Sequence, residues 1–152
     1  MNVYRITREK YQHDLMGTGA RLYGGRWNPV GVSLLYTAES RALAAMEFSV
    51  RMDITAMPDN LVIQQISLSL GRGKELLKEL GEGELPSAWN KYPERTTTQH
   101  IGKQFAGLGN YLALKVPSVA ISHSYHFLVN TQHPVFRKNV RLVSTQEFVI
   151  GR

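Results

Sequence analysis

The fold is organised around residues 24–50, which read GGRWNPVGVSLLYTAESRALAAMEFSV. The apolar run at residues 33–37 predicts a strand. Ser40 then stands where a helix N-cap is expected, and apolar residues at helical spacing predict a helix that runs to about Met52. Before the strand, residues 16–33 hold five glycines and one proline and predict a long irregular segment. Long loops in compact domains are often functional, so this segment is a candidate site.

The flanking sequence predicts more strands than helices. The expected strands lie at residues 3–6, 60–70, 112–116, 127–130, 140–143 and 147–150. The expected helices lie at 74–80 and at about 99–105, the latter capped by Thr97 or Thr98. Because the strands cluster without regular alternation with helices, the chain is expected to be α+β, with mainly antiparallel sheet and short flanking helices. The length of 152 residues fits a single domain spanning residues 1–152.

Several classes of protein are excluded by composition. The absence of cysteine excludes a disulfide scaffold, a thiolate metal site and a cysteine nucleophile. The N-terminal residues are charged throughout and lack the apolar centre of a signal peptide. No stretch approaches the roughly 20 apolar residues that span a bilayer. We therefore expect a cytoplasmic protein without a membrane span.

The charge is positive and unevenly placed. The net charge is +6, and residues 99–152 carry six Lys and Arg against one Glu. A basic surface attracts nucleic acid, phosphate-bearing small molecules or an acidic protein. The basic residues are dispersed, which equally fits a role in solubility alone. The sequence lacks the interleaved aromatic and basic residues of stacking platforms and a helix-turn-helix pattern, so a nucleic-acid-binding module is the least favoured class.

Three residues carry candidate chemistry. Arg26 stands among glycines, where its planar guanidinium could grip phosphate oxygens, although a tight turn with a surface arginine has the same pattern. Glu47 lies beside an apolar helical stripe, and such a carboxylate either reaches solvent or has a buried partner. Ser118 follows Pro117 at a strand end, where serine is ordinarily a turn residue.

The histidines do not form a metal-site pattern. His123 and His126 are three residues apart, but no acidic residue or cysteine lies near them in the sequence. We expect no bound metal, and surface or packing roles for these histidines.

Taken together, these motifs resemble the RES-domain family of bacterial toxin–antitoxin systems, which is named for an Arg, a Glu and a Ser. The resemblance covers nearly the whole chain and is most specific between Gly19 and Glu47. The segments that carry it are Tyr4-Arg5-Ile6, Gly24-Gly25-Arg26-Trp27-Asn28, Tyr36-Thr37-Ala38-Glu39-Ser40, Val116-Pro117-Ser118, Leu128-Val129-Asn130 and His133-Pro134. The chain departs from the family pattern at Thr131 and in its C-terminal tail, so no role is assigned to the tail.

The resemblance implies an ADP-ribosyltransferase-like fold and a toxin that consumes NAD as its substrate, with no further cofactor. Carried over residue by residue, it implies catalytic roles for Arg26, Tyr36, Glu47 and Ser118, and NAD contacts by the same residues and Asn28. Arg26 would bind the pyrophosphate or a ribose, Tyr36 the nicotinamide, and Ser118 either Glu47 or the carboxamide.

The resemblance also implies partners and leaves the reaction open. The expected partner is an Xre-type helix-turn-helix antitoxin, through which any contact with DNA would be indirect, and a homodimer is a further expectation. Cleavage of the nicotinamide–ribose bond by water or phosphate is the leading interpretation. Transfer of ADP-ribose to a protein side chain at the same site is the alternative, and the sequence does not separate the two.

Overall fold

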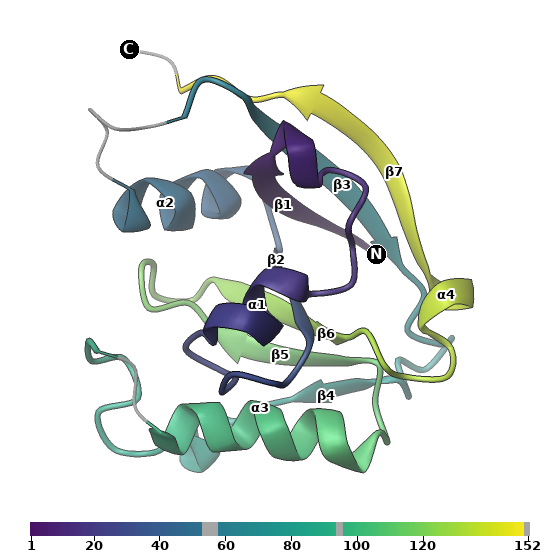
Figure 1. Cartoon of the computed structure of the whole chain (residues 1–152). Helices are drawn as coiled ribbons and strands as arrows, with labels where there is room; N and C mark the ends of the chain where they lie inside the picture. Colours follow the sequence, from purple (N-terminus) through teal and green to yellow (C-terminus); the bar gives the residue numbers. More distant parts are fainter. Residues whose placement is uncertain (53–57, 94–95, 151–152) are drawn as a thin grey trace.

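The structure is a computed structural model that describes residues 1–52, 58–93 and 96–150 (Figure 1). Its strands are β1 (Asn2–Arg8), β2 (Leu34–Ala38), β3 (Leu61–Leu68), β4 (Leu77–Glu79), β5 (Ala113–Pro117), β6 (Tyr125–Asn130) and β7 (Val140–Glu147). Its helices are α1 (Thr18–Tyr23), α2 (Arg41–Arg51), α3 (Thr96–Leu108) and α4 (Phe136–Asn139), with short 3-10 turns η1 (Glu9–Tyr11) and η3 (Glu82–Glu84). The expected α+β class, with a mainly antiparallel sheet and short helices, is confirmed.

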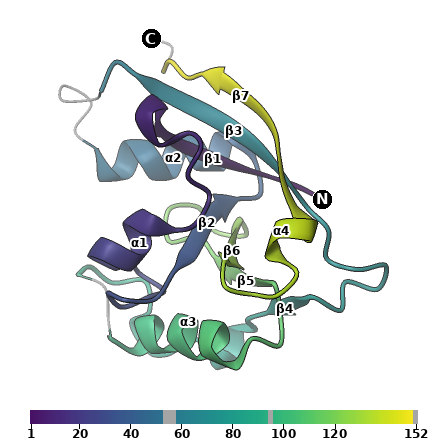
Figure 2. The same ribbon diagram turned by 45° about the vertical axis from the view of Figure 1, so that its right-hand side comes forward.

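The seven strands form one sheet that is nearly divided in two. The strand order is β4-β5-β6-β2-β1-β3-β7, and every neighbouring pair is antiparallel except β4 with β5. β1 pairs with β3 along its whole length, but it meets β2 at the single pair Tyr4–Ala38. The block β1-β3-β7 therefore separates from the block β4-β5-β6-β2, as Figures 1 and 2 show. This separation opens a space between β1 and β2.

Alternating side chains of the second block build two cores, because successive residues of a strand face opposite sides. Leu34 of β2 packs with Trp27 and with Phe105 of α3 on one side. Leu35 packs on the other side, in the cluster that contains Val3 and Phe136. The helix α3 therefore covers one face of the second block, and the Trp27 segment is held between them.

The helix α2 is placed as its sequence predicts. The Ser40 hydroxyl accepts a hydrogen bond from the Leu43 amide at 3.1 Å, which confirms the predicted N-cap. Leu43 and Ala44 are buried against Ala38 of β2. Residues three and four positions apart share a helix face, so anchoring Leu43 directs Glu47 toward the space between β1 and β2.

Four local predictions are wrong. Thr97 and Thr98, one of which is expected to cap the third helix, both lie inside α3. Residues 74–80, expected as a helix, contain the short strand β4, because Leu77 to Glu79 pair with β5 and edge pairing overrides the helical pattern. The irregular segment 16–33 contains the helix α1. The strand expected at residues 140–143 extends to Glu147 as β7, whose register against β3 shifts between Gln65 and Ile66. The further strand expected at residues 147–150 does not form, because β7 ends at Glu147 and residues 148–150 are irregular.

No helix in the described parts of the chain has the length and apolar content to cross a bilayer.

Candidate active site

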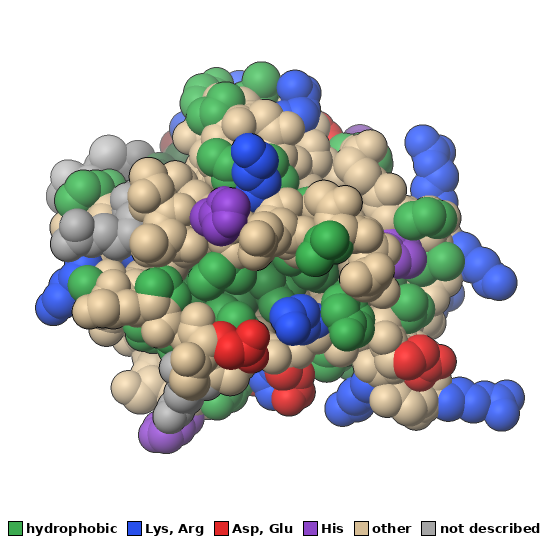
Figure 3. All heavy atoms as spheres, turned by 90° about the horizontal axis from the view of Figure 1, so that it is seen from below, with side chains coloured by type: hydrophobic (Ala, Val, Ile, Leu, Met, Phe, Trp, Pro, Cys, Tyr) green, Lys and Arg blue, Asp and Glu red, His purple; other side chains and the backbone are tan. Residues whose placement is uncertain are grey.

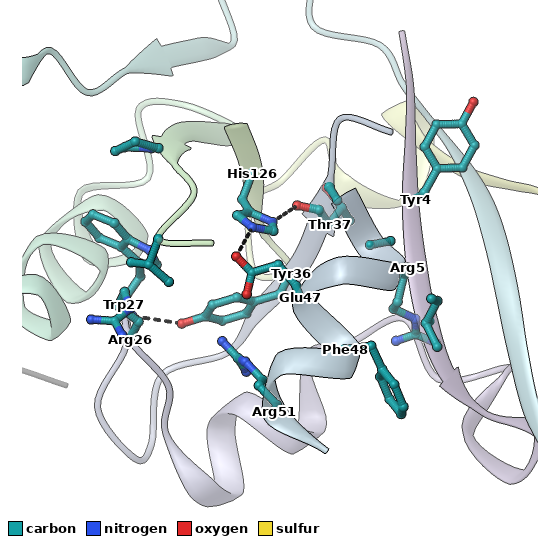
Figure 4. A pocket seen from close by; sticks show the side chains of 15 residues that line it. Tyr4, Arg5, Arg26, Trp27, Tyr36, Thr37, Glu47, Phe48, Arg51 and His126 are labelled. Atoms are coloured by element: carbon teal, nitrogen blue, oxygen red, sulfur yellow. Dashed lines mark hydrogen bonds and ion pairs between the residues drawn. The ribbon is translucent and has the colours of Figure 1, made fainter. Parts of the chain in front are cut away.

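A pocket occupies the space where the sheet divides, and the predicted residues Arg26, Tyr36 and Glu47 line it (Figure 4). β1 contributes Arg5 to one wall, and His126 of β6 stands at the other. The walls also contain Tyr4, Ile6, Trp27, Thr37, Ala38, Ala44, Phe48, Arg51, Pro117 and Val119. The structure thus brings side chains from far-separated parts of the sequence to one cavity.

Among the described residues that line the pocket, Glu47 is the only carboxylate, and two side chains contact it. Its Oε1 atom accepts a hydrogen bond from the Ser118 hydroxyl at 2.9 Å and lies 2.9 Å from Nε2 of His126. Burial raises the pKa of Glu47, because it disfavours the charged carboxylate. Four interactions lower it: the hydrogen bond and the charge of His126, the hydrogen bond of Ser118 and the charge of Arg51. Together they outweigh burial, so the pKa of Glu47 lies below its ordinary value. Glu47 is therefore ionised at neutral pH. We call Glu47, Ser118 and His126 the carboxylate cluster.

The Ser118 hydroxyl uses all of its hydrogen-bonding positions within the protein. Its Oγ accepts hydrogen bonds from the amides of Ala120 at 3.0 Å and Ile121 at 3.2 Å. A hydroxyl has a single proton, so with both acceptor positions in use the proton points to Glu47. Ser118 is also buried and absent from the pocket lining. Of the two predicted roles, the geometry favours contact with Glu47 over contact with a nicotinamide.

Tyr36 lines the pocket, and two hydrogen bonds fix its hydroxyl. The hydroxyl donates to Oδ1 of Asn28 at 2.7 Å and accepts from the Trp27 amide at 3.0 Å. The ring therefore has a fixed orientation, suited to stacking on a flat ligand.

Asn28 is fully buried and is not among the residues that line the pocket. Its side-chain amide nitrogen donates to the carbonyls of Ala20, Pro29 and Val32 at 2.8–3.0 Å, and its oxygen accepts from Tyr36. The predicted NAD contact by Asn28 is not what this geometry supports. Asn28 ties the glycine-rich loop together and supports Tyr36.

Arg26 lines the pocket but is partly engaged by the chain. Its Nη1 atom donates to the carbonyls of Trp89 at 2.9 Å and Lys91 at 3.0 Å. The ring of Trp89 also lies 6.1 Å from that of Trp27, centroid to centroid. Arg26 thus fastens the segment around residues 89–91 beside the pocket, and Nε and Nη2 form no hydrogen bond with the described residues. Those two atoms keep the fork geometry that suits a phosphate.

If the protein cleaves NAD, as its resemblance to the RES-domain family implies, we expect Arg26→Lys to lower that rate by about a hundredfold, because one ammonium cannot hold two carbonyls and also present two parallel donors to a ligand. The measurement is nicotinamide release by the purified variant, with Arg72→Lys in an exposed loop as the matched control. Wild-type turnover with altered tryptophan fluorescence would limit Arg26 to fastening the segment around Trp89.

Two further arginines, Arg5 and Arg51, line the pocket, and they differ in their hydrogen bonds to the rest of the protein. Arg5 donates to Gln64, Asp14 and Tyr11, and burial lowers its pKa to about 10 against the opposing charge of Asp14. Its side chain therefore ties β1 to the segment after it. Arg51, at the end of α2, is exposed and points toward the pocket in Figure 4. It forms no hydrogen bond or ion pair with the described residues, so its guanidinium is available to an anionic ligand.

Sequence reasoning missed His126. Its neighbours along the chain gave no signal, because the carboxylate it contacts is 79 positions away. The pairing of β6 with β2, which sets His126 opposite Ala38, is what brings them together. A search of the described residues finds no group of three or more His, Cys, Asp or Glu side chains placed to hold a metal ion.

Comparison with known proteins agrees with this architecture. The fold resembles a chain of the M. tuberculosis MbcT–MbcA toxin–antitoxin complex, with a TM-score of 0.77 and 18% identity over 97% of this chain and 83% of that one. The RES domain family matches residues 2–151. The chain is 32% identical to Toxin Res of Photorhabdus laumondii over 99% of this chain and 94% of that protein. It is 36% identical to the Prs ADP-ribosylating toxin of a Sphingobium species over 80% of this chain and 74% of that protein.

The fold and the site thus define an α+β protein of the kind seen in bacterial toxins. The chain belongs to the RES domain family, as the match over residues 2–151 shows.

Proposed function

We propose that this protein is the toxin of a toxin–antitoxin pair and that it breaks the nicotinamide–ribose bond of NAD in the cytoplasm. The observation that carries the proposal is Glu47, an ionised carboxylate held by Ser118 and His126 in the same cavity as the Tyr36 ring. The family membership and the toxins among its relatives support the same conclusion.

The chemistry needs one carboxylate. Nicotinamide in NAD is cationic, so when the bond breaks the electron pair leaves with nicotinamide, which departs neutral and needs no proton. The ribose carbon develops positive charge, as in other glycoside cleavages. The Glu47 carboxylate stabilises that charge or binds a ribose hydroxyl. Water then attacks the carbon and releases a proton to the solvent, or an anionic phosphate oxygen attacks the carbon without losing a proton.

The arginines of the pocket fit the rest of the substrate. NAD carries a pyrophosphate, and Arg26 and Arg51 both border the cavity. Guanidinium groups bind phosphate oxygens through charge-assisted hydrogen bonds. The Tyr36 ring supplies a flat surface for nicotinamide. Lys and Arg are dispersed on the face seen from below in Figure 3, with hydrophobic side chains at its centre, which does not favour a nucleic-acid surface.

One observation favours a second function. The Sphingobium relative is called an ADP-ribosylating toxin. A protein side chain could replace water as the acceptor after nicotinamide has left, and the same Glu47 would then orient that acceptor. Both reactions share the first bond cleavage.

The decisive experiment is incubation of the purified protein with NAD alone and then with bacterial lysate. Nicotinamide release with free ADP-ribose, or with ADP-ribose phosphate when phosphate is added, supports cleavage of NAD. Transfer of labelled ADP-ribose to a lysate protein, with little free ADP-ribose, supports the second function. Absence of nicotinamide release in both arms would overturn the proposal.

The proposed partner is an antitoxin of the Xre type that closes the pocket. The similarity in fold to a chain of a toxin–antitoxin complex supports a partner of this kind. A carboxylate-bearing segment would suit Arg26 and Arg51, because it competes with phosphate for the same donors. Such a complex should fail to bind NAD, and a complex that binds NAD as well as the free toxin does would contradict occlusion.

Expression of this chain alone in a bacterium is expected to lower cellular NAD before growth stops. The order is informative because arrested cells also lose NAD secondarily. NAD and optical density are measured in parallel over time, with the Glu47→Gln variant as the control. Arrest at constant NAD would favour the protein-modifying function.

A further inference from the structure

The two ring nitrogens of His126 have different partners. Nδ1 lies 3.1 Å from the backbone carbonyl oxygen of Thr37, and Nε2 lies 2.9 Å from Oε1 of Glu47. A carbonyl oxygen only accepts, so the hydrogen bond to Thr37 requires a proton on Nδ1. The contact with Glu47 needs a second proton, because a bare nitrogen lone pair and a carboxylate oxygen repel one another at 2.9 Å. Both contacts can be hydrogen bonds at the same time only if the ring carries a proton on each nitrogen.

The surroundings keep this arrangement in place. The side chains of His126 and Glu47 are 15% and 14% exposed. The Thr37 carbonyl belongs to β2, which pairs with β6, so the sheet itself fixes the ring orientation. Figure 4 shows the two dashed contacts of the ring, with Glu47 below it and Thr37 beside it.

Both donors reach the same carboxylate oxygen. Ser118 and His126 bind Oε1 of Glu47, and no hydrogen bond from the described residues reaches Oε2. Two donors at fixed positions leave the carboxylate little freedom to rotate. Oε1 thus fixes the position of the carboxylate, and Oε2 is available to a ligand.

We propose that His126 is a positioning residue for Glu47: as an imidazolium locked by Thr37, it holds Oε1 and so presents Oε2 to the substrate. This inference rests on the proposed NAD cleavage for its consequence in catalysis, but its geometry is independent of the substrate. His126 does not transfer its proton in the bond cleavage, because nicotinamide leaves as a neutral molecule.

The first test observes the protons directly. Nitrogen-15 NMR of the imidazole ring in the wild-type protein at neutral pH is expected to show both His126 nitrogens protonated. In Glu47→Gln, the same ring is expected to carry a single proton, because the carboxylate charge that favours the second proton is gone. The exposed His100 serves as the internal reference that does not change between the two proteins. A wild-type His126 with a single protonated nitrogen would overturn the proposal.

The second test separates positioning from packing. His126→Leu removes both donors, and we expect kcat for NAD cleavage to fall by roughly a hundredfold with KM nearly unchanged, since a misplaced reactive group costs about that much. His126→Gln can still donate to Oε1 from its side-chain amide, and we expect kcat within about tenfold of wild type. His100→Gln is the matched control on the exposed face of α3.

The outcomes distinguish this proposal from the proposed function. If the wild-type protein releases no nicotinamide, the proposed function fails, while the NMR test still decides the protonation of His126. If the wild type cleaves NAD and a folded His126→Leu protein does so at the same rate, the positioning role is wrong and the proposed function stands. If His126→Leu does not fold, the NMR result and the rate of His126→Gln decide instead. A kcat for His126→Gln as low as that of Glu47→Gln would contradict the positioning role, because the glutamine amide still offers a donor to Oε1 of Glu47.

Discussion

Replacing Glu47 by glutamine is expected to lower kcat for the proposed NAD cleavage by about a hundredfold or more while the protein remains folded. The glutamine oxygen can still accept from Ser118, so the local packing survives. The negative charge that faces the developing positive charge on the ribose is lost, and that loss acts on the transition state more than on substrate binding. Nicotinamide release under saturating NAD measures the effect.

The control for this variant is Glu147→Gln, which makes the same chemical change at an exposed position of β7. It is expected to leave the rate unchanged. Thermal unfolding of both variants should stay within a few degrees of wild type. A folded Glu47→Gln protein with wild-type turnover would remove Glu47 from the reaction.

Replacing Gly102 by alanine is expected to destabilise the fold by about 3 kcal/mol, which corresponds to a loss of ~10 °C in Tm for a domain of this size. Gly102 lies in α3 where the helix backbone approaches the Trp27 carbonyl. A Cβ at this position would overlap that carbonyl oxygen and would press on Leu34 at 3.2 Å. A backbone carbonyl cannot turn away as a flexible side chain does, so α3 must move off the sheet.

The matched control is Gly107→Ala in the same helix, where a Cβ meets nothing within 4 Å. Alanine favours helix over glycine by up to about 1 kcal/mol, so this variant should keep or raise Tm. Calorimetry or circular dichroism of the two variants is the measurement. Equal Tm values for both would show that α3 does not depend on close contact at Gly102.

The central unit of the fold is predictable from local sequence. The strand β2 and the helix α2 follow from an apolar run, a capping serine and helical spacing, all within residues 33–52. The strand β4 is not predictable in this way, because it is supported by a pairing with β5 more than thirty residues later and by packing of Leu77 against the core. Local sequence patterns predict the elements that local interactions stabilise. They do not predict elements, such as β4, that form by pairing with a strand far away in the sequence.

The residues of the candidate site also differ in whether local sequence predicts them. Arg26, Tyr36 and Glu47 stand in one segment whose motifs resemble a family, and the structure brings all three to one pocket. The contacts of Asn28 and the saturated hydroxyl of Ser118 depend on which atoms lie within about 3 Å in the folded chain, which the sequence does not contain. His126 has no motif around it, and strand register alone places it.

The near-division of the sheet has a consequence for how the site tolerates change. Tyr36 and the carboxylate cluster come from α2 and from the second block, while the facing wall comes from β1 of the first block. The two blocks share one backbone pair, Tyr4–Ala38, the packing of α2 on both, and the core cluster that contains Val3 and Leu35. No member of the carboxylate cluster lies on a strand of the first block, so a substitution in β1 can reshape the facing wall without replacing any contact among Glu47, Ser118 and His126. The shape of the cavity and the contacts of the carboxylate thus depend on different side chains.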